Sequence, residues 1–71
     1  GSPLAIFKYV SSTPADTWTI FHNRKTINFI VQVNNDNNGG INNIRVFDEN
    51  TVVIDFSKPD TGEATLVIFD L

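Results

Sequence analysis

This chain contains no cysteine and no methionine, and it has one histidine among its 71 residues. Without cysteine, no disulfide can brace the fold and no thiolate can act as a nucleophile or a metal ligand. Stability must therefore come from the hydrophobic residues, which make up 41% of the sequence. A chain of this length is expected to form one domain around a single small core.

Basic residues are also scarce, because five lysines and arginines against eight acidic residues give a net charge of −3. Only Arg24 and Lys25 are adjacent, so no basic stripe is available for nucleic acid or for an anionic membrane surface. No apolar run approaches the ~20 residues that cross a bilayer, and no signal peptide is visible. We expect neither nucleic acid nor membrane as a partner. Gly1 and Ser2 resemble a tag remnant, which leaves residues 3–71 as a single β domain.

What the sequence does contain is an alternation of apolar and polar residues with a period of two. The clearest case is the segment 27–33, where Ile27, Phe29, Val31 and Val33 share one face. Turn-rich segments separate six such stretches at spacings of about ten residues. We therefore predict an all-β fold, a small antiparallel β-sandwich or partly open barrel of about six short strands. The expected strands lie at about residues 3–10, 17–22, 26–34, 44–47, 51–57 and 64–69.

The alternation also assigns faces and connections. Trp18 and Ile20 are expected to point inward, as are two apolar rows in the last two strands. These rows are Val52, Ile54 and Phe56, and Ala64, Leu66 and Ile68. In the first strand the inward pair is either Ile6 and Val10 or Phe7 and Tyr9. Pro14 is expected to end strand pairing, residues 57–62 to form a loop, and the tract 35–40 to form an exposed, mobile hairpin loop.

A set of short motifs suggests a family. Thr17-Trp18-Thr19-Ile20-Phe21-His22-Asn23 carries a W-T-I-x-H-N pattern, and a V-Q-V strand with a D-x-N-G turn follows at residues 31–39. An N-T-V-x-I-x-F-S segment and a T-G-x-A segment complete the series at residues 50–57 and 61–64. Together these motifs cover residues 16–69. The chain resembles small β modules of tailed-bacteriophage virion proteins, of the tail-fibre or baseplate-associated type.

The resemblance implies a structural role for the motif residues Trp18, Ile20, His22 and Asn23. Trp18 is expected to be buried with its indole N–H on a backbone carbonyl, and His22 to fix the adjacent turn through a hydrogen bond. Modules of this kind usually have Leu-Gly after His-Asn, where this chain has Arg24 and Lys25. The turn must therefore take another geometry, or Asn23 must adopt the left-handed conformation.

The residues offer little chemistry for catalysis or metal binding. No glycine-flanked serine marks a nucleophile, and most carboxylates fall in predicted turns, so we do not expect an enzyme or a cofactor. The segment from Asn34 to Arg45 imitates a calcium loop, but its first position is neutral and its twelfth is a cation. We therefore expect no metal. Carbohydrate binding stays open, because exposed aromatic residues and the Asn-rich tract suit sugars.

Four apolar residues interrupt the outward rows of the predicted strands and form our candidate interaction surface. They are Ile30, Val53, Val67 and Phe69. We predict a structural or assembly module located in a phage or prophage virion, which binds other virion proteins. The resemblance also allows a homo-oligomer, such as a trimer. The alternative is a receptor- or carbohydrate-binding module at a fibre tip, with a host surface glycan as its partner.

Overall fold

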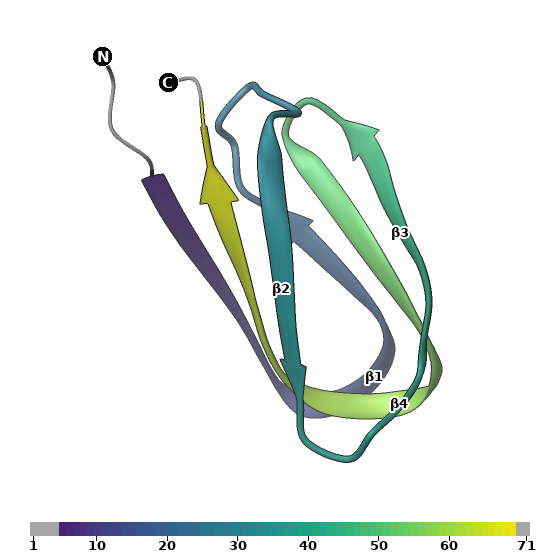
Figure 1. Cartoon of the computed structure of the whole chain (residues 1–71). Helices are drawn as coiled ribbons and strands as arrows, with labels where there is room; N and C mark the ends of the chain where they lie inside the picture. Colours follow the sequence, from purple (N-terminus) through teal and green to yellow (C-terminus); the bar gives the residue numbers. More distant parts are fainter. Residues whose placement is uncertain (1–4, 70–71) are drawn as a thin grey trace.

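The computed structural model describes residues 5–69, which form four β-strands (Figure 1). The strands are β1 (Ala5–Phe21), β2 (Phe29–Asn35), β3 (Ile41–Asp48) and β4 (Thr51–Ile68). Each of β1, β2 and β3 pairs antiparallel with β4. The fold is therefore all-β and antiparallel, as predicted, and it is one open sheet. This part of the chain has no helix that could cross a membrane. The tag remnant expected at Gly1 and Ser2 lies outside the described residues.

The prediction of about six short strands is wrong in number, because two pairs of expected strands are continuous. β1 includes the first and second expected strands, and β4 includes the fifth and sixth. Pro14 and Pro59 lie inside these long strands, at the segment where the β1–β4 register shifts. Proline cannot donate to a ladder, and a bulge accommodates it without ending the strand. The segments expected to separate strands instead form a bend.

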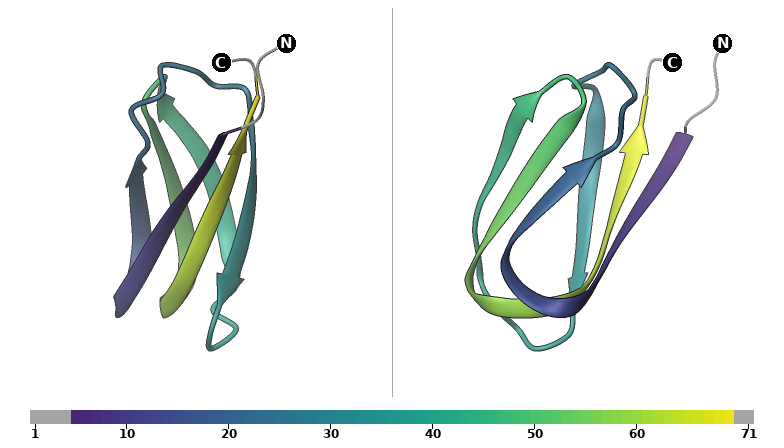
Figure 2. Two further views of the ribbon diagram at one scale, coloured as in Figure 1. Left: turned by 90° about the vertical axis from the view of Figure 1, so that its left-hand side faces the viewer. Right: turned by 180° about the vertical axis from the view of Figure 1, so that it is seen from behind.

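The two long strands curve through this bend together, and the sheet folds back over itself (Figure 2). In what we call the β2 half, residues 5–11 of β1 and 62–68 of β4 lie with β2. In the β3 half, residues 17–21 of β1 and 51–56 of β4 lie with β3. The two halves therefore share two strands, and each adds a third strand of its own.

The tract from Asn35 to Gly40 joins β2 to β3, but it does not form the expected hairpin. β2 pairs with residues 62–68 of β4 and β3 pairs with residues 51–56, so the two strands belong to different halves. The tract therefore crosses from one half of the sheet to the other beside the bend (Figure 1). Local sequence could not distinguish these two connections, because asparagine and glycine suit a tight turn and a crossing loop equally well.

One core lies between the two halves. Its fully or almost fully buried members come from β1 and β4, and the inward rows that we predicted for the last two expected strands are among them. The core residues are Trp18, Ile20, Val52, Ile54, Phe56, Ala64, Leu66 and Ile68. In the first strand, Phe7 and Tyr9 face this core and Ile6 and Val10 are exposed, which settles the two alternatives.

Trp18 is the largest side chain in this core. It is fully buried, and its ring centroid lies 4.5 Å from that of Phe56 and 5.8 Å from that of Tyr9. Its indole N–H donates a hydrogen bond of 3.3 Å to the backbone oxygen of Asp60, as expected for a buried tryptophan. The indole thus joins β1 to the bend of β4.

The connection between β1 and β2 contains two residues in the left-handed conformation, Asn23 with φ of 54° and Lys25 with φ of 55°. Of the two alternatives for this turn, the left-handed Asn23 is therefore the one that the structure shows. Lys25 occupies the position where the family pattern has glycine, and it adopts the same positive φ without glycine's freedom. The Lys25 N–H donates to Asn50 Oδ1 at 3.0 Å, which helps to hold this conformation.

We expect Trp18→Ala to lower the free energy of unfolding by about 3–5 kcal/mol, because it removes the largest core side chain and leaves a cavity. Chemical denaturation followed by circular dichroism measures the loss. Phe21→Ala is the control, because that ring is 60% exposed and its removal should change stability by less than about 0.5 kcal/mol. Equal stabilities for the two variants would contradict this account of the core.

We expect Lys25→Gly to stabilise the protein by about 0.5–1 kcal/mol. Relief of a left-handed residue gains roughly 1–2 kcal/mol, and the entropy of glycine in the unfolded chain offsets part of it. Arg24→Gly is the control, because it also removes one positive charge, at the preceding residue, whose φ is not positive. It should not stabilise the protein. Melting curves of the two variants test the prediction, which is wrong if Arg24→Gly raises the melting temperature as much as Lys25→Gly does.

Candidate functional site

Asp60, on β4 at the bend, is a carboxylate with no solvent exposure. Five N–H donors from four residues point at its two oxygens, at distances from 2.7 to 3.2 Å. The donors are Asn35 Nδ2, Asn37 N and Nδ2, Gly39 N and Thr61 N. Asn35 is the last residue of β2, and Asn37 and Gly39 lie in the β2–β3 connection, so this carboxylate ties that connection to the bend. The tract is thus anchored at several points, and it is not the hairpin that we expected.

The hydrogen bonds also control the ionisation of Asp60. Burial by itself would raise the pKa of this carboxyl, because a charge is poorly solvated in the interior. The hydrogen bonds from Asn35, Gly39, Thr61 and Asn37 outweigh burial and lower the pKa from 3.8 to about 2. The carboxylate is therefore ionised in the folded protein at all but strongly acidic pH.

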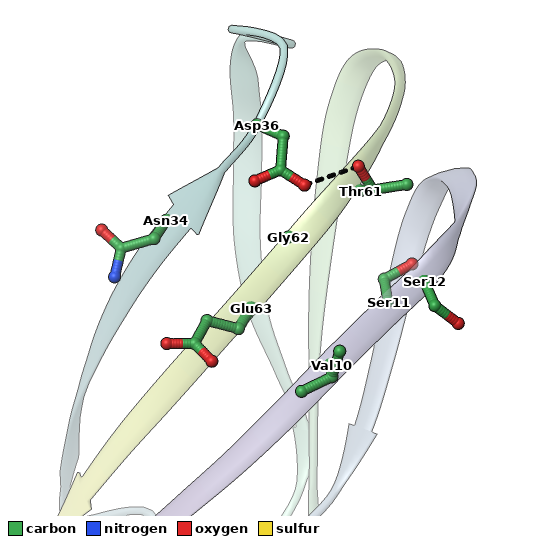
Figure 3. A pocket seen from close by; sticks show the side chains of 8 residues that line it. All are labelled: Val10, Ser11, Ser12, Asn34, Asp36, Thr61, Gly62 and Glu63. Carbon is green, nitrogen blue, oxygen red and sulfur yellow. Dashed lines mark hydrogen bonds between the residues drawn. The ribbon is translucent and has the colours of Figure 1, made fainter.

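The bend also carries an open depression of about 460 Å³ on the outer side of the sheet (Figure 3). It is lined by Val10, Ser11, Ser12, Asn34, Asp36, Thr61, Gly62 and Glu63. Two of its polar groups already have partners, since Thr61 Oγ1 donates to Asp36 Oδ2 at 2.7 Å and Ser11 Oγ donates to the Thr13 oxygen at 2.8 Å. Gly62 has a φ of 145°, and a Cβ there would collide with the Asn34 oxygen. These residues are engaged in contacts of the bend itself, so we interpret the depression as a feature of the bend and not as a binding site.

His22, the single histidine, is buried, with only 3% of its surface exposed. Its Nδ1 accepts a hydrogen bond of 3.1 Å from the Arg24 N–H, as we expected for a turn-fixing residue. Burial, and then the positive charge of Arg24, lower the pKa of the imidazole, while the Asp48 carboxylate acts in the opposite direction. The imidazole packs edge-on against Phe29, with ring centroids 5.3 Å apart. These contacts give His22 a structural role.

The structure separates the four residues of our candidate interaction surface. Ile30 and Val67 are direct cross-strand neighbours on the outer side of the β2 half. Phe69 follows β4, is partly exposed, and donates its N–H to the Asn28 oxygen at 2.9 Å. Val53 lies in the β3 half and is only 6% exposed, so it is not continuous with the others. Residues 53 and 67 both belong to β4, but this strand bends between them, so they lie in different halves of the sheet.

The outer side of the β2 half carries one further exposed apolar residue, Ile6, which the sequence did not identify as part of the interaction surface. Ile6 of β1 pairs with Val67, which in turn pairs with Ile30 of β2. We call these three residues the apolar row. Ile6 is 62% exposed and Ile30 is 58% exposed, so the row crosses all three strands at the surface. The alternation in the first expected strand could not identify Ile6 as exposed, because either face of that strand could have been buried.

The β3 half has a different outer surface. An open groove of about 430 Å³ is lined there by Thr17, Thr19, Arg45, Phe47, Thr51 and Val53, which we call the β3 groove. All eight residues of β3 are exposed. Residues 5–69 hold no cluster of three or more side chains that could bind a metal ion.

We expect Asp60→Asn to lower the melting temperature far more than Asp36→Asn does. The first change points an amide N–H₂ at donors that need an acceptor, whereas the second affects one exposed hydroxyl contact. Because folding lowers the pKa of Asp60, its stabilising effect is complete above about pH 4. This effect is lost as the pH falls from 3.8 to about 2, since the unfolded chain takes up the proton first.

Melting curves between pH 6 and pH 2 test this prediction. The difference between the wild type and Asp60→Asn should shrink over that acidic interval, and the difference for Asp36→Asn should stay small throughout. A wild type that loses no more stability on acidification than Asp60→Asn would show that the carboxylate contributes nothing.

Comparison with known proteins returns no match to any family, curated protein or solved structure. The resemblance to phage modules therefore depends on the motif residues themselves. In this fold those residues have clear structural environments: Trp18 in the core, His22 at the turn, and Gly62 at the bend.

Proposed function

We propose that this chain is an assembly module of a tailed-phage or prophage virion, from a tail, baseplate or fibre protein, that binds other virion proteins. The observation that carries the proposal is the apolar row, in which the half-buried Val67 pairs directly with the exposed Ile6 and Ile30 across the β2 half. Exposed apolar side chains that lie together mark protein contacts, whereas single ones do not. The resemblance to virion modules supports the location.

The strand edges support the same proposal. Among the described residues, β1, β2 and β3 pair only with β4, so each has one edge without a strand neighbour. Such edges present backbone N–H and C=O groups that can pair with another chain. The apolar row runs from the β1 edge to the β2 edge, so a neighbouring subunit could bury side chains and extend the sheet at the same place. This arrangement is also compatible with a homo-oligomer such as a trimer.

We also propose that the folded sheet acts as a small sandwich, with one core between two three-stranded halves. A rigid two-layer unit suits a structural role, because it presents two outer faces in fixed orientation. A catalytic role has less support. The imidazole is buried and held by the Arg24 N–H, and the Asp60 carboxylate is enclosed by its five donors. Neither group is accessible to a substrate.

The test is concentration-dependent mass, measured by light scattering and sedimentation up to millimolar protein. We expect the wild type to self-associate and the double variant Ile6→Lys/Ile30→Lys to stay monomeric, because two cations in the apolar row oppose its burial. Gln32→Lys is the matched control, since this exposed polar residue lies two positions from Ile30 on the same face. It should associate as the wild type does.

The comparison requires that the double variant and the wild type have the same melting temperature. We expect this, because both substituted residues are more than half exposed. A wild type that remains monomeric at every concentration would contradict self-assembly through this face. Association that is unchanged by Ile6→Lys/Ile30→Lys would instead show that another surface is responsible.

A further inference from the structure

The β3 groove lies on the outer side of the β3 half, away from the apolar row. Its centre is the cross-strand set Thr19, Val53 and Arg45, which are directly paired across three strands. Thr17 and Thr51 lie on the same outer side, two residues along β1 and β4 from this set. The groove of about 430 Å³ falls within the size range of small-molecule sites, and its lining combines hydroxyls, one guanidinium and apolar surface.

Thr51 presents to the groove a hydroxyl that no described residue uses. Only 9% of its surface is exposed, it lines the groove, and its hydroxyl makes no hydrogen bond to any described residue. The hydroxyl is still reached by solvent, because the only buried side-chain polar atom without a partner among the described residues is His22 Nε2. A ligand hydroxyl in the groove would supply the missing partner. Thr19 also lines the groove, with a hydroxyl that has no partner among residues 5–69.

Phe47 is the most exposed large hydrophobic residue of the described chain, at 70%. It lies on β3 at a register shift between Val46 and Asp48, and it lines the groove. Bulges of this kind redirect side chains and recur beside binding sites. An aromatic ring has a negative face that attracts the weakly positive C–H groups of a sugar ring. Phe47 therefore places an exposed aromatic ring beside the threonine hydroxyls of the groove, the combination that a sugar ring requires.

The groove carries almost no net charge. Arg45 is its only charged lining residue, and Arg45 Nε donates to Asp55 Oδ2 at 3.0 Å. A second, longer bond of 3.4 Å joins Arg45 Nη2 to Asp55 Oδ1. The guanidinium therefore offers hydrogen-bond donors without an uncompensated positive charge. This balance disfavours sulfate, phosphate and acidic sugars and favours a neutral ligand.

We propose that the β3 groove binds a neutral saccharide. Phe47 would contact the C–H face of one sugar ring, and Thr19, Thr51 and Arg45 would exchange hydrogen bonds with its hydroxyls, with Val53 as the apolar floor. Sugars need both donors and acceptors beside an apolar surface, and threonine hydroxyls serve as both. Because the groove is open and a single ring makes few contacts, affinity should be on the order of millimolar.

The experiment is an amide NMR titration of the 71-residue chain with glucose, galactose, mannose, N-acetylglucosamine and their common disaccharides, with sulfate and sialic acid as anionic arms. We expect saturable shifts at Thr19, Arg45, Phe47 and Val53 with at least one neutral sugar, and none with either anion. Phe47→Ala should weaken binding about tenfold or more, the fold-change expected when an aromatic contact is lost.

Two further variants make the test specific. Thr51→Val keeps the shape and removes only the unpaired hydroxyl, so it should weaken binding while leaving the melting temperature unchanged or higher. Phe21→Ala is the control for the aromatic contact, because Phe21 is an exposed aromatic on the same outer face that pairs with Thr51 but does not line the groove. It should bind as the wild type does.

Three results would overturn the proposal. They are the absence of groove shifts with every neutral sugar, stronger shifts with an anion than with any sugar, and equal binding by Phe47→Ala and Phe21→Ala. None of these results bears on assembly through the apolar row, which lies on the other half of the sheet. The light-scattering test with Ile6→Lys/Ile30→Lys can fail or succeed independently.

Discussion

The hydrogen bonds of the Asp60 carboxylate hold the bend of β4 and the β2–β3 connection together. The arrangement of the two halves of the sheet depends on this bend. Its oxygens accept N–H groups from the β2–β3 connection and from Thr61, and its backbone oxygen accepts the Trp18 indole N–H. One residue thus joins the bend of β4, the crossing connection and the largest core side chain. A buried charge is costly unless fully hydrogen-bonded, and the five donors meet that condition. The bend then determines how the two halves of the sheet face each other.

Because β4 pairs with all three other strands, it places the two outer surfaces relative to each other. Val67 belongs to the apolar row and Val53 to the β3 groove, although both are outward residues of this one strand. The bend between them separates an apolar surface that suits protein contacts from a polar groove that suits a small ligand. Assembly and sugar binding, which were alternatives at the level of sequence, are therefore compatible as proposals, because they concern two different faces.

The family-like motifs acquire physical reasons in this structure. Gly62 is required because any Cβ would meet the backbone of Asn34, and His22 fixes its turn by accepting the Arg24 N–H. Lys25 stands where the phage modules have glycine, and it adopts the left-handed conformation itself. Motif residues of this kind describe how the chain folds, and they carry no information about which molecule binds to its surfaces.

The sequence by itself determined the all-β class, the inward rows of β4 and the burial of Trp18, because side-chain alternation is a local property of an extended chain. It also indicated the left-handed Asn23. The tertiary structure alone decided that six expected strands are four, because proline and turn residues are compatible with a bulged bend once the partner strand bends with them. It likewise decided that the Asn-rich tract crosses between halves. The apolar row and the β3 groove each combine residues from three strands, and such neighbours exist only after long-range pairing.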